Sequence, residues 1–130
     1  MANITLDQLI RARALIEDEA FWIQGLREDG FGLAHCAFGA LNYIISEDKR
    51  SDVDASHPTL IALLLVIRQT AKDIPKEIVE DHAPFNLMWF NDNHSHTEVL
   101  ALFDRAIERQ RLIDDLKAAP PVMQAMEPVA

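Results

Sequence analysis

A helix start at residues 95–98 constrains the fold more than any other feature of this chain. Ser95 is followed three residues later by Glu98, which is the spacing of a capping box. In that motif the serine hydroxyl accepts a hydrogen bond from the glutamate N–H, and the carboxylate accepts one from the serine N–H. Apolar residues then recur at helical spacing, and they are Val99, Leu100, Phe103, Ala106, Ile107 and Ile113. The pattern predicts a long amphipathic helix with one core face and one solvent face.

The composition indicates one soluble globular domain. The chain has 130 residues, of which 49% are apolar and 25% charged, and folding at this length buries roughly two-thirds of the surface. The single cysteine excludes an intrachain disulfide and a zinc site made only of cysteines, and it suits a reducing compartment. The first residues lack the pattern of a signal peptide, and the longest apolar run, residues 60–67, is far shorter than the ~20 residues of a membrane span. We therefore expect a cytoplasmic protein with no membrane contact.

The N-terminal part predicts two helices joined by an extended arm. A second capping box, Thr5 with Gln8, opens a helix that should run to about Glu19. Aromatic and β-branched residues and a glycine-containing turn follow, so an extended arm or small hairpin is expected near residues 21–33. Helical sequence resumes over residues 33–45, where small side chains would let another helix approach closely.

The middle of the chain predicts the buried centre of the fold. Residues 46–56 are polar and charged, which is typical of a connecting loop. Residues 58–71 begin with a proline, and their apolar side chains wrap nearly all the way round, so this helix should be buried. A short helix over residues 75–82, closed by Pro84, and a polar elbow over residues 91–96 should then lead into the long helix.

These patterns predict a mostly α, compact fold of about five helices with one short arm. Residues 1–117 are expected to form the single domain, and residues 118–130 a tail that is mobile or docks on a partner. Trp22 and Trp89 should be core residues, and Asn91 or a backbone carbonyl should accept from an indole N–H.

Three short stretches of the sequence are considered together because they form one recognisable pattern. They are Phe21-Trp22-Ile23-Gln24-Gly25, Cys36-Ala37-Phe38-Gly39-Ala40-Leu41, and Trp89-Phe90-Asn91-Asp92 followed by residues 98–107. The set resembles a bacterial and phage family of small proteins known as a domain of unknown function, over most of positions 6–109. The chain departs from that family at the inserted Phe90, and at His94 and His96, where a Pro-Gly-Arg-like turn is expected. The resemblance supports the helix boundaries and implies no chemistry, since the family has no established activity.

The formal charge of -9 argues against unaided binding to nucleic acid or to an anionic membrane, because both carry negative charge. The acids occur in short clusters, which are typical of solvated helix faces. A sharper hypothesis is that an acidic surface imitates a phosphate backbone and occupies a basic groove on a protein partner, such as a nucleic-acid-binding protein. A phage-type inhibitor would act in this way. The candidate partner-binding residues are Glu17, Asp18, Asp114 and Asp115.

Cys36 is the candidate nucleophile. With His94 or His96, and with Asn91 or Asp92, it supplies the residue types of a thiolate–imidazole pair oriented by a third group. The chain would then be a Cys-His hydrolase or transferase. A cysteine in an alanine- and glycine-rich helical strip is more often a small buried hydrophobe, and we favour that interpretation.

The elbow residues also include potential metal ligands. Asp92, His94 and His96 are residue types that bind zinc or another transition metal, with His82 or Cys36 completing the shell. Two histidines two positions apart do not share a helix face, and the chain has no His-Glu-x-x-His motif. A polar capping turn is the favoured interpretation.

The chain lacks a glycine-rich phosphate loop, a Gly-x-Ser-x-Gly elbow and a basic-aromatic stripe. The absence of these motifs argues against the enzyme classes that depend on them. The sequence therefore predicts a non-enzymatic binding or interaction module without a cofactor, with the Cys-His enzyme as the alternative and a metal-binding protein as a third hypothesis.

Overall fold

The fold is mostly α, as the helical periodicity predicts. The computed structural model describes residues 4–26, 28–30, 32–49, 53, 56–79 and 83–118, and this part of the chain contains six α-helices and one short 3-10 helix but no strand. The elements are α1 (Ile4–Leu15), η1 (Glu19–Phe21), α2 (Ala37–Lys49), α3 (Pro58–Thr70), α4 (Lys76–Val79), α5 (Ala83–Asn93) and α6 (His96–Ala118). None of the helices in these ranges has the length and apolar content of a membrane span.

The core is built around α3, in agreement with its nearly continuous apolar sequence. Leu60, Leu63 and Ile67 on this helix are fully buried. The helix packs against α1, α5 and α6, so it meets apolar side chains on several sides. Burying a leucine or isoleucine stabilises a fold by ~1.5–3 kcal/mol relative to leaving it exposed.

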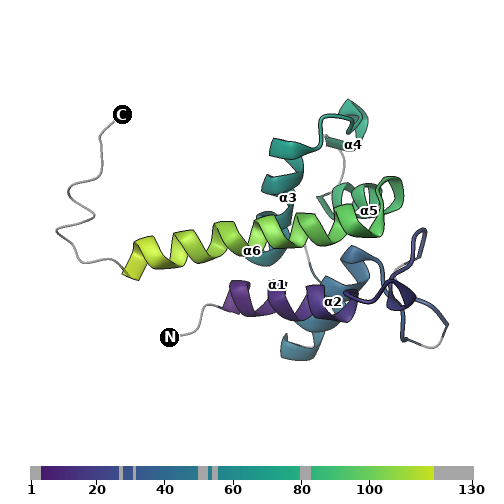
Figure 1. Cartoon of the computed structure of the whole chain (residues 1–130), viewed down its shortest axis with the longest axis horizontal. Coiled ribbons are helices and arrows are strands. Elements are labelled where there is room, and N and C mark those ends of the chain that lie inside the picture. The colour runs from purple at the N-terminus through teal and green to yellow at the C-terminus, as the bar shows by residue number, and fades with distance from the viewer. Residues whose placement is uncertain are drawn as a thin grey trace.

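Helices α1 and α6 lie side by side and run in opposite directions (Figure 1). Arg13 on α1 donates through Nε to Oδ1 of Asp104 on α6 at 2.6 Å. The last turns of α6 extend beyond the other helices (Figure 1). Leu112 and Leu116 on these turns are exposed as a consequence.

The predicted start of α6 is confirmed. The Ser95 N–H donates to Glu98 Oε1 at 3.0 Å, and the Glu98 N–H donates to Ser95 Oγ at 3.2 Å. The predicted elbow over residues 91–96 is wrong in its first half, because α5 continues through Asn93 and leaves only His94 and Ser95 between the helices. The side chain of Asn91 is buried inside the fold, which a solvated elbow would not allow.

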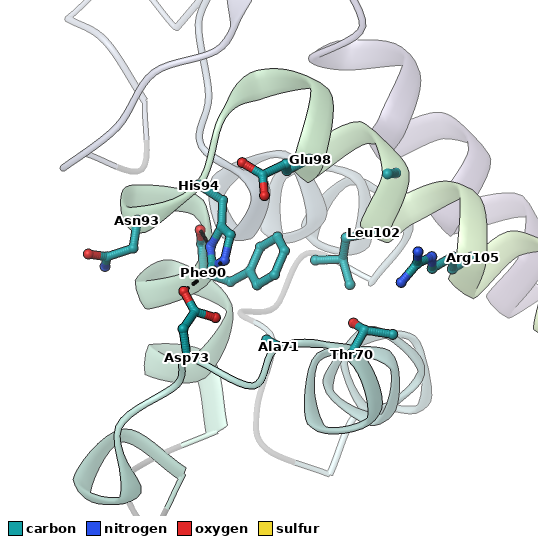
Figure 2. Close-up of a pocket in the computed structure, with 10 residues that line it drawn as sticks. Thr70, Ala71, Asp73, Phe90, Asn93, His94, Glu98, Leu102 and Arg105 are labelled. Atoms are coloured by element: carbon teal, nitrogen blue, oxygen red, sulfur yellow. Dashed lines mark hydrogen bonds and ion pairs between the residues drawn. The ribbon is translucent and has the colours of Figure 1, made fainter.

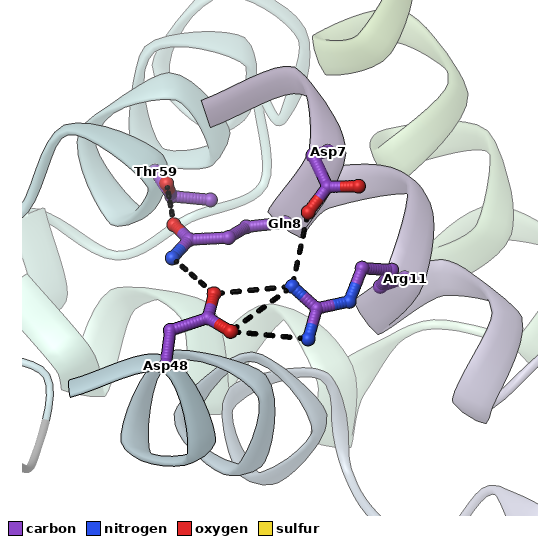
Figure 3. A network of polar contacts seen from close by, with 5 residues as sticks. All are labelled: Asp7, Gln8, Arg11, Asp48 and Thr59. Carbon is purple, nitrogen blue, oxygen red and sulfur yellow. Dashed lines mark hydrogen bonds and ion pairs between the residues drawn. The ribbon is translucent and has the colours of Figure 1, made fainter. Parts of the chain in front are cut away.

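Both predicted bounds of α1, the cap at Thr5 and the end near Glu19, are wrong. The helix begins at Ile4 and ends at Leu15, and Gln8 is buried rather than capping the helix. Its Oε1 accepts from the Thr59 hydroxyl at 2.7 Å, and its Nε2 donates to Asp48 at 3.0 Å (Figure 3). Partners on α3 and α2 therefore draw the amide into the interior.

The second helix is displaced from its predicted range. It begins at Ala37 and runs to Lys49, so residues 46–49 of the predicted connector are helical. Asp48 accepts from both Gln8 and Arg11 on α1, and these contacts explain why the helix continues (Figure 3). The rest of the predicted connector lies outside the described residues except at positions 53 and 56, as do residues 80–82 and 119–130.

The segment between α1 and α2 forms the expected extended arm. His35 holds it together, since its N–H donates to the Phe21 carbonyl at 2.9 Å and its carbonyl accepts from the Ile23 N–H at 3.1 Å. Isolated bridges join His35 to Trp22 and to Glu28. Gly25 turns the arm at a φ of 81°, a conformation that residues with a Cβ rarely adopt.

Candidate functional site

Asn91 ties the three stretches of the family-like set together. Its Oδ1 accepts from the Trp22 indole N–H at 2.6 Å and from the Ala37 N–H at 2.9 Å. Its Nδ2 donates to the Ile23 carbonyl at 2.9 Å and to Asp92 Oδ1 at 3.2 Å. The amide is fully buried and uses both of its oxygen lone pairs and both of its hydrogens. The predicted role of Asn91 as the acceptor of an indole N–H is confirmed for Trp22.

Gln24, on the arm, caps the C-terminal end of α5. Its Nε2 lies 3.1 Å from the Asn91 carbonyl, 3.3 Å from that of Asp92 and 3.0 Å from that of His94. The last carbonyls of a helix have no partner within the helix, so a side-chain amide here satisfies otherwise unbonded acceptors. The Gly25 N–H donates to Asp92 Oδ1 at 2.8 Å and fixes the arm at the same point. We call the group Trp22, Gln24, Gly25, Asn91 and Asp92 the arm knot, and its contacts give these residues a structural role.

The structure places the two candidate histidines in different surroundings. His94 stacks on Phe90 at a centroid distance of 3.9 Å, and its Nε2 lies 3.2 Å from Asp73 Oδ2. The Nε2 of His96 lies 2.6 Å from the Ile16 carbonyl, and its ring contacts that of Trp22.

Cys36 lies at the N-terminus of α2. Its carbonyl accepts from the Ala40 N–H at 2.9 Å, and its Sγ accepts from the Gly39 N–H at 3.3 Å. The side chain is buried, with 3% of its surface exposed. The thiol therefore acts as a helix cap, and neither His94 nor His96 hydrogen-bonds to it.

The candidate metal ligands do not converge. Asp92 points its Oδ1 to Gly25 and Asn91, whereas His94 and His96 face Asp73 and Ile16. Among the described residues there is no group of three or more histidines, cysteines or acids that could hold a metal. His82 lies outside those residues.

A pocket of about 460 Å³, which the sequence did not predict, lies between the end of α3, the end of α5 and the first turns of α6 (Figure 2). Asp73, His94 and Glu98 line one end, and Arg105 and Thr70 line the other. Ala71, Phe90 and Leu102 also line the pocket, although most of the exposed lining is polar. Only the spacing of Glu98, Leu102 and Arg105 along one helix face could have signalled this site, because the remaining lining comes from distant parts of the chain.

The profile of a family of unknown function, DUF6197, matches residues 2–109. The chain belongs to this family. No curated protein and no solved structure matches it. The DUF6197 match includes the whole arm knot and every residue that lines the pocket, and it stops before the last turns of α6.

Carboxylates gather at the arm end of this DUF6197 chain. The end of α1, the arm and the end of α5 lie at the same end of the molecule (Figure 1). In the sequence, positions 16–30 and 91–93 contain one basic residue, Arg27, among six acids. Their acids define what we call the acidic end, and they are Glu17, Asp18, Glu19, Glu28, Asp29 and Asp92.

A neighbouring pKa shift has a mainly local cause. Glu47, one turn further along α2, raises the pKa of the exposed Tyr43 phenol above its ordinary value through its negative charge and a hydrogen bond, and Glu28 on the arm contributes least. Negative charge disfavours the phenolate.

The four candidate partner-binding acids separate into two pairs. Glu17 pairs with Arg13 at 3.0 Å, and Asp18 caps η1 by accepting from the Ala20 N–H at 3.0 Å, so both belong to the acidic end. Asp114 accepts from Gln110 Nε2 at 2.9 Å near the far end of α6. That end has mixed charge, because Arg109, Arg111 and Lys117 accompany Asp114 and Asp115.

Proposed function

We propose that this protein is a non-enzymatic binding module whose acidic end docks on a basic surface of a protein partner in the cytoplasm. The observation that carries the proposal is the gathering of six carboxylates at the end where the arm joins α1 and α5, against one basic residue, Arg27, among positions 16–30 of the sequence. The negative electrostatic potential of these carboxylates attracts a basic surface and speeds its association. A partner that itself binds nucleic acid offers a surface of this kind, and occupying it is how a phage-type inhibitor would act.

The arm knot supports docking at this end, because it holds the arm in one position. The arm is pinned to α5 through Trp22, Gln24 and Gly25. A surface that is already ordered loses little conformational entropy when it binds, so more of the interaction free energy appears as affinity.

The Cys-His enzyme has no comparable support. The thiol of Cys36 is buried and caps α2, and both ring nitrogens of His94 already face oxygen atoms of Phe90 and Asp73. A thiolate–imidazole pair requires the two side chains to lie within hydrogen-bond reach of each other.

Charge reversal tests the proposal. Affinity capture with the wild-type chain identifies a partner, and the association rate of the purified pair is then measured at low and high salt. Glu17→Lys with Glu19→Lys should slow association several-fold and should lower the melting temperature only slightly, since Asp18 still caps η1 and the lost Glu17–Arg13 ion pair is exposed. Wild-type binding should weaken as the salt concentration rises.

Asp114→Lys with Asp115→Lys is the matched comparison, because it reverses the same number of charges at the mixed-charge end of α6. It should slow association less than the first pair of substitutions. Binding that does not respond to salt, or equal rates for the wild type and the Glu17/Glu19 variant, would rule out docking through the acidic end.

A further inference from the structure

The pocket beside α6 carries opposite charges at its two ends. Glu98 and Arg105 lie on the same face of α6, two turns apart, with Leu102 between them (Figure 2). Two helical turns span about 10.5 Å along the axis at ~1.5 Å per residue. The His94 ring lies between Glu98 and Asp73, and Thr70 lies on the same side of the pocket as Arg105 (Figure 2).

The acidic end of the pocket, which we call its acidic pole, remains net negative in either state of His94. Glu98 uses Oε1 for both of its bonds to Ser95, and Asp73 uses Oδ2 to face His94, so each carboxylate keeps a second oxygen. The Ser95 backbone and hydroxyl bonds lower the pKa of Glu98, so this carboxylate is ionised at neutral pH. The two carboxylates carry more negative charge than one imidazolium carries positive charge, and a neutral imidazole carries none.

His94 is held in place by two oxygen atoms. Its Nδ1 lies 2.9 Å from the Phe90 carbonyl, and its Nε2 lies 3.2 Å from Asp73 Oδ2. Both oxygens are acceptors, so both contacts are hydrogen bonds only when the ring carries two protons. The ring stacks on Phe90 and forms a wall of the acidic pole, and the remaining oxygens of Asp73 and Glu98 are left to contact a ligand.

Arg105 forms the opposite pole. Among the described residues it has no carboxylate partner, although Arg11 and Arg13 on the same protein each bind two. A guanidinium presents several N–H donors in a planar fork that fits a carboxylate. Its place in the pocket lining puts that fork within reach of a ligand.

We propose that this pocket binds a short linear zwitterion about as long as a tripeptide, with its ammonium group at Asp73 and Glu98 and its carboxylate at Arg105. An extended tripeptide spans about 10 Å, at ~3.3–3.6 Å per residue, which is close to the ~10.5 Å rise along α6 from Glu98 to Arg105. Ala71, Phe90 and Leu102 lie in the lining between the charged ends, and most of the exposed lining is polar, which suits a peptide backbone with small side chains. The pocket volume lies within the ~300–1,000 Å³ that is usual for ligand pockets.

Trialanine and its capped forms test the inference on the full-length protein. An NMR titration of the labelled chain should give a Kd on the order of 1 mM for trialanine, with shifts centred on the amides of Thr70, His94 and Leu102. N-acetylation and C-amidation should each weaken binding about fivefold, because each removes one charged contact. Dialanine is too short to reach both poles and should bind more weakly than trialanine.

Two pocket variants test which charged end of the peptide binds at each pole. Arg105→Gln should make trialanine and its amide bind equally, and Glu98→Gln should reduce the effect of N-acetylation while glutamine still accepts the Ser95 N–H. Glu108→Gln and Arg109→Gln, on the same helix but outside the pocket lining, should bind all the peptides as the wild type does. Reversing Glu17 and Glu19 should also leave peptide binding unchanged, which separates this inference from the docking proposal.

Three results would overturn the inference. The first is a doubly capped trialanine that binds as tightly as the free peptide, and the second is a set of shifts that lies away from the pocket. The third is the absence of any shift at about ten times the expected Kd, where a single site would be ~90% occupied.

Discussion

At the scale of single residues, two side chains that the sequence offered as catalytic candidates make contacts that stabilise the fold. Asn91 satisfies two N–H donors from elements far along the chain, and Cys36 caps α2 with its thiol. A buried amide with four good hydrogen bonds rigidifies its surroundings, whereas the same network with one member missing leaves buried donors without acceptors. The arm knot should therefore be among the positions most sensitive to substitution.

Asn91→Ala should lower the free energy of unfolding by about 3–5 kcal/mol, since it leaves the Trp22 indole N–H and the Ala37 N–H without their acceptor. Urea denaturation followed by circular dichroism measures the loss. Asn93→Ala is the matched control, because the exposed Asn93 makes one bond, from Nδ2 to the Trp89 carbonyl. The control should cost less than about 1 kcal/mol, and equal losses for the two variants would show that the arm knot does not hold the arm.

At the scale of elements, the helices differ in what sets their ends. The start of α6 is set locally by Ser95 and Glu98, three residues apart. The end of α5 is set from a distance by Gln24 on the arm. A local capping box survives changes elsewhere in the fold, whereas the end of α5 depends on the arm staying in place.

Ser95→Ala should cost about 1 kcal/mol of stability at neutral pH, typical of removing an N-cap acceptor. Thr97→Ala is the control, since it removes a hydroxyl from the same turn without removing the cap, and it should have little effect. Urea midpoints at neutral pH give the comparison. An unchanged midpoint for Ser95→Ala would mean that the capping box contributes nothing to stability.

The same capping box predicts a dependence on pH. The Ser95 bonds lower the pKa of Glu98 in the folded protein below its ordinary value. Its stabilising contribution is therefore fully present above the ordinary carboxyl pKa of ~4.3 and is lost as the pH falls through the lower folded-state value. The difference in stability between the wild type and Glu98→Gln should accordingly shrink as the pH is lowered below about 4, when measured by urea denaturation at a series of pH values. A difference that stays constant from neutral to acid pH would exclude this linkage.

At the scale of the whole molecule, a buried polar contact joins the three N-terminal helices. Gln8 on α1 bonds to Asp48 on α2 and to Thr59 on α3 (Figure 3). Arg11 adds an outer layer, since it pairs with both Asp7 and Asp48 at 3.0 Å. The inner contact excludes water and should matter more to the packing of the helices than the outer one.

Gln8→Ala should destabilise the protein by about 2–4 kcal/mol, because it leaves a cavity and removes the acceptor of the buried Thr59 hydroxyl. Asp7→Ala, one residue earlier, breaks an exposed ion pair and should cost about 0.5 kcal/mol or less. Thermal unfolding with coincident fluorescence and circular dichroism tests both. Gln8→Ala unfolding in one transition at nearly the wild-type temperature would show that this contact does not join the helices.

The sequence by itself determined the helical class, the start of α6 and the burial of α3. These features depend on short-range relations, such as the three-residue spacing of Ser95 and Glu98 and the apolar run of residues 60–67. Such relations act within a turn or two of helix and are visible before any tertiary contact exists.

The tertiary structure alone decided where Gln8 points, that Asn91 lies within a helix and also accepts from Ala37, where the pocket lies and which acids gather. Gln8 bonds to Thr59 across 51 positions of sequence, and Trp22 bonds to Asn91 across 69. The capping pattern at residues 5–8 and the turn pattern at residues 91–93 did not form as predicted. A buried amide gains more stability from hydrogen bonds to distant interior partners than from a local hydrogen bond that water can replace.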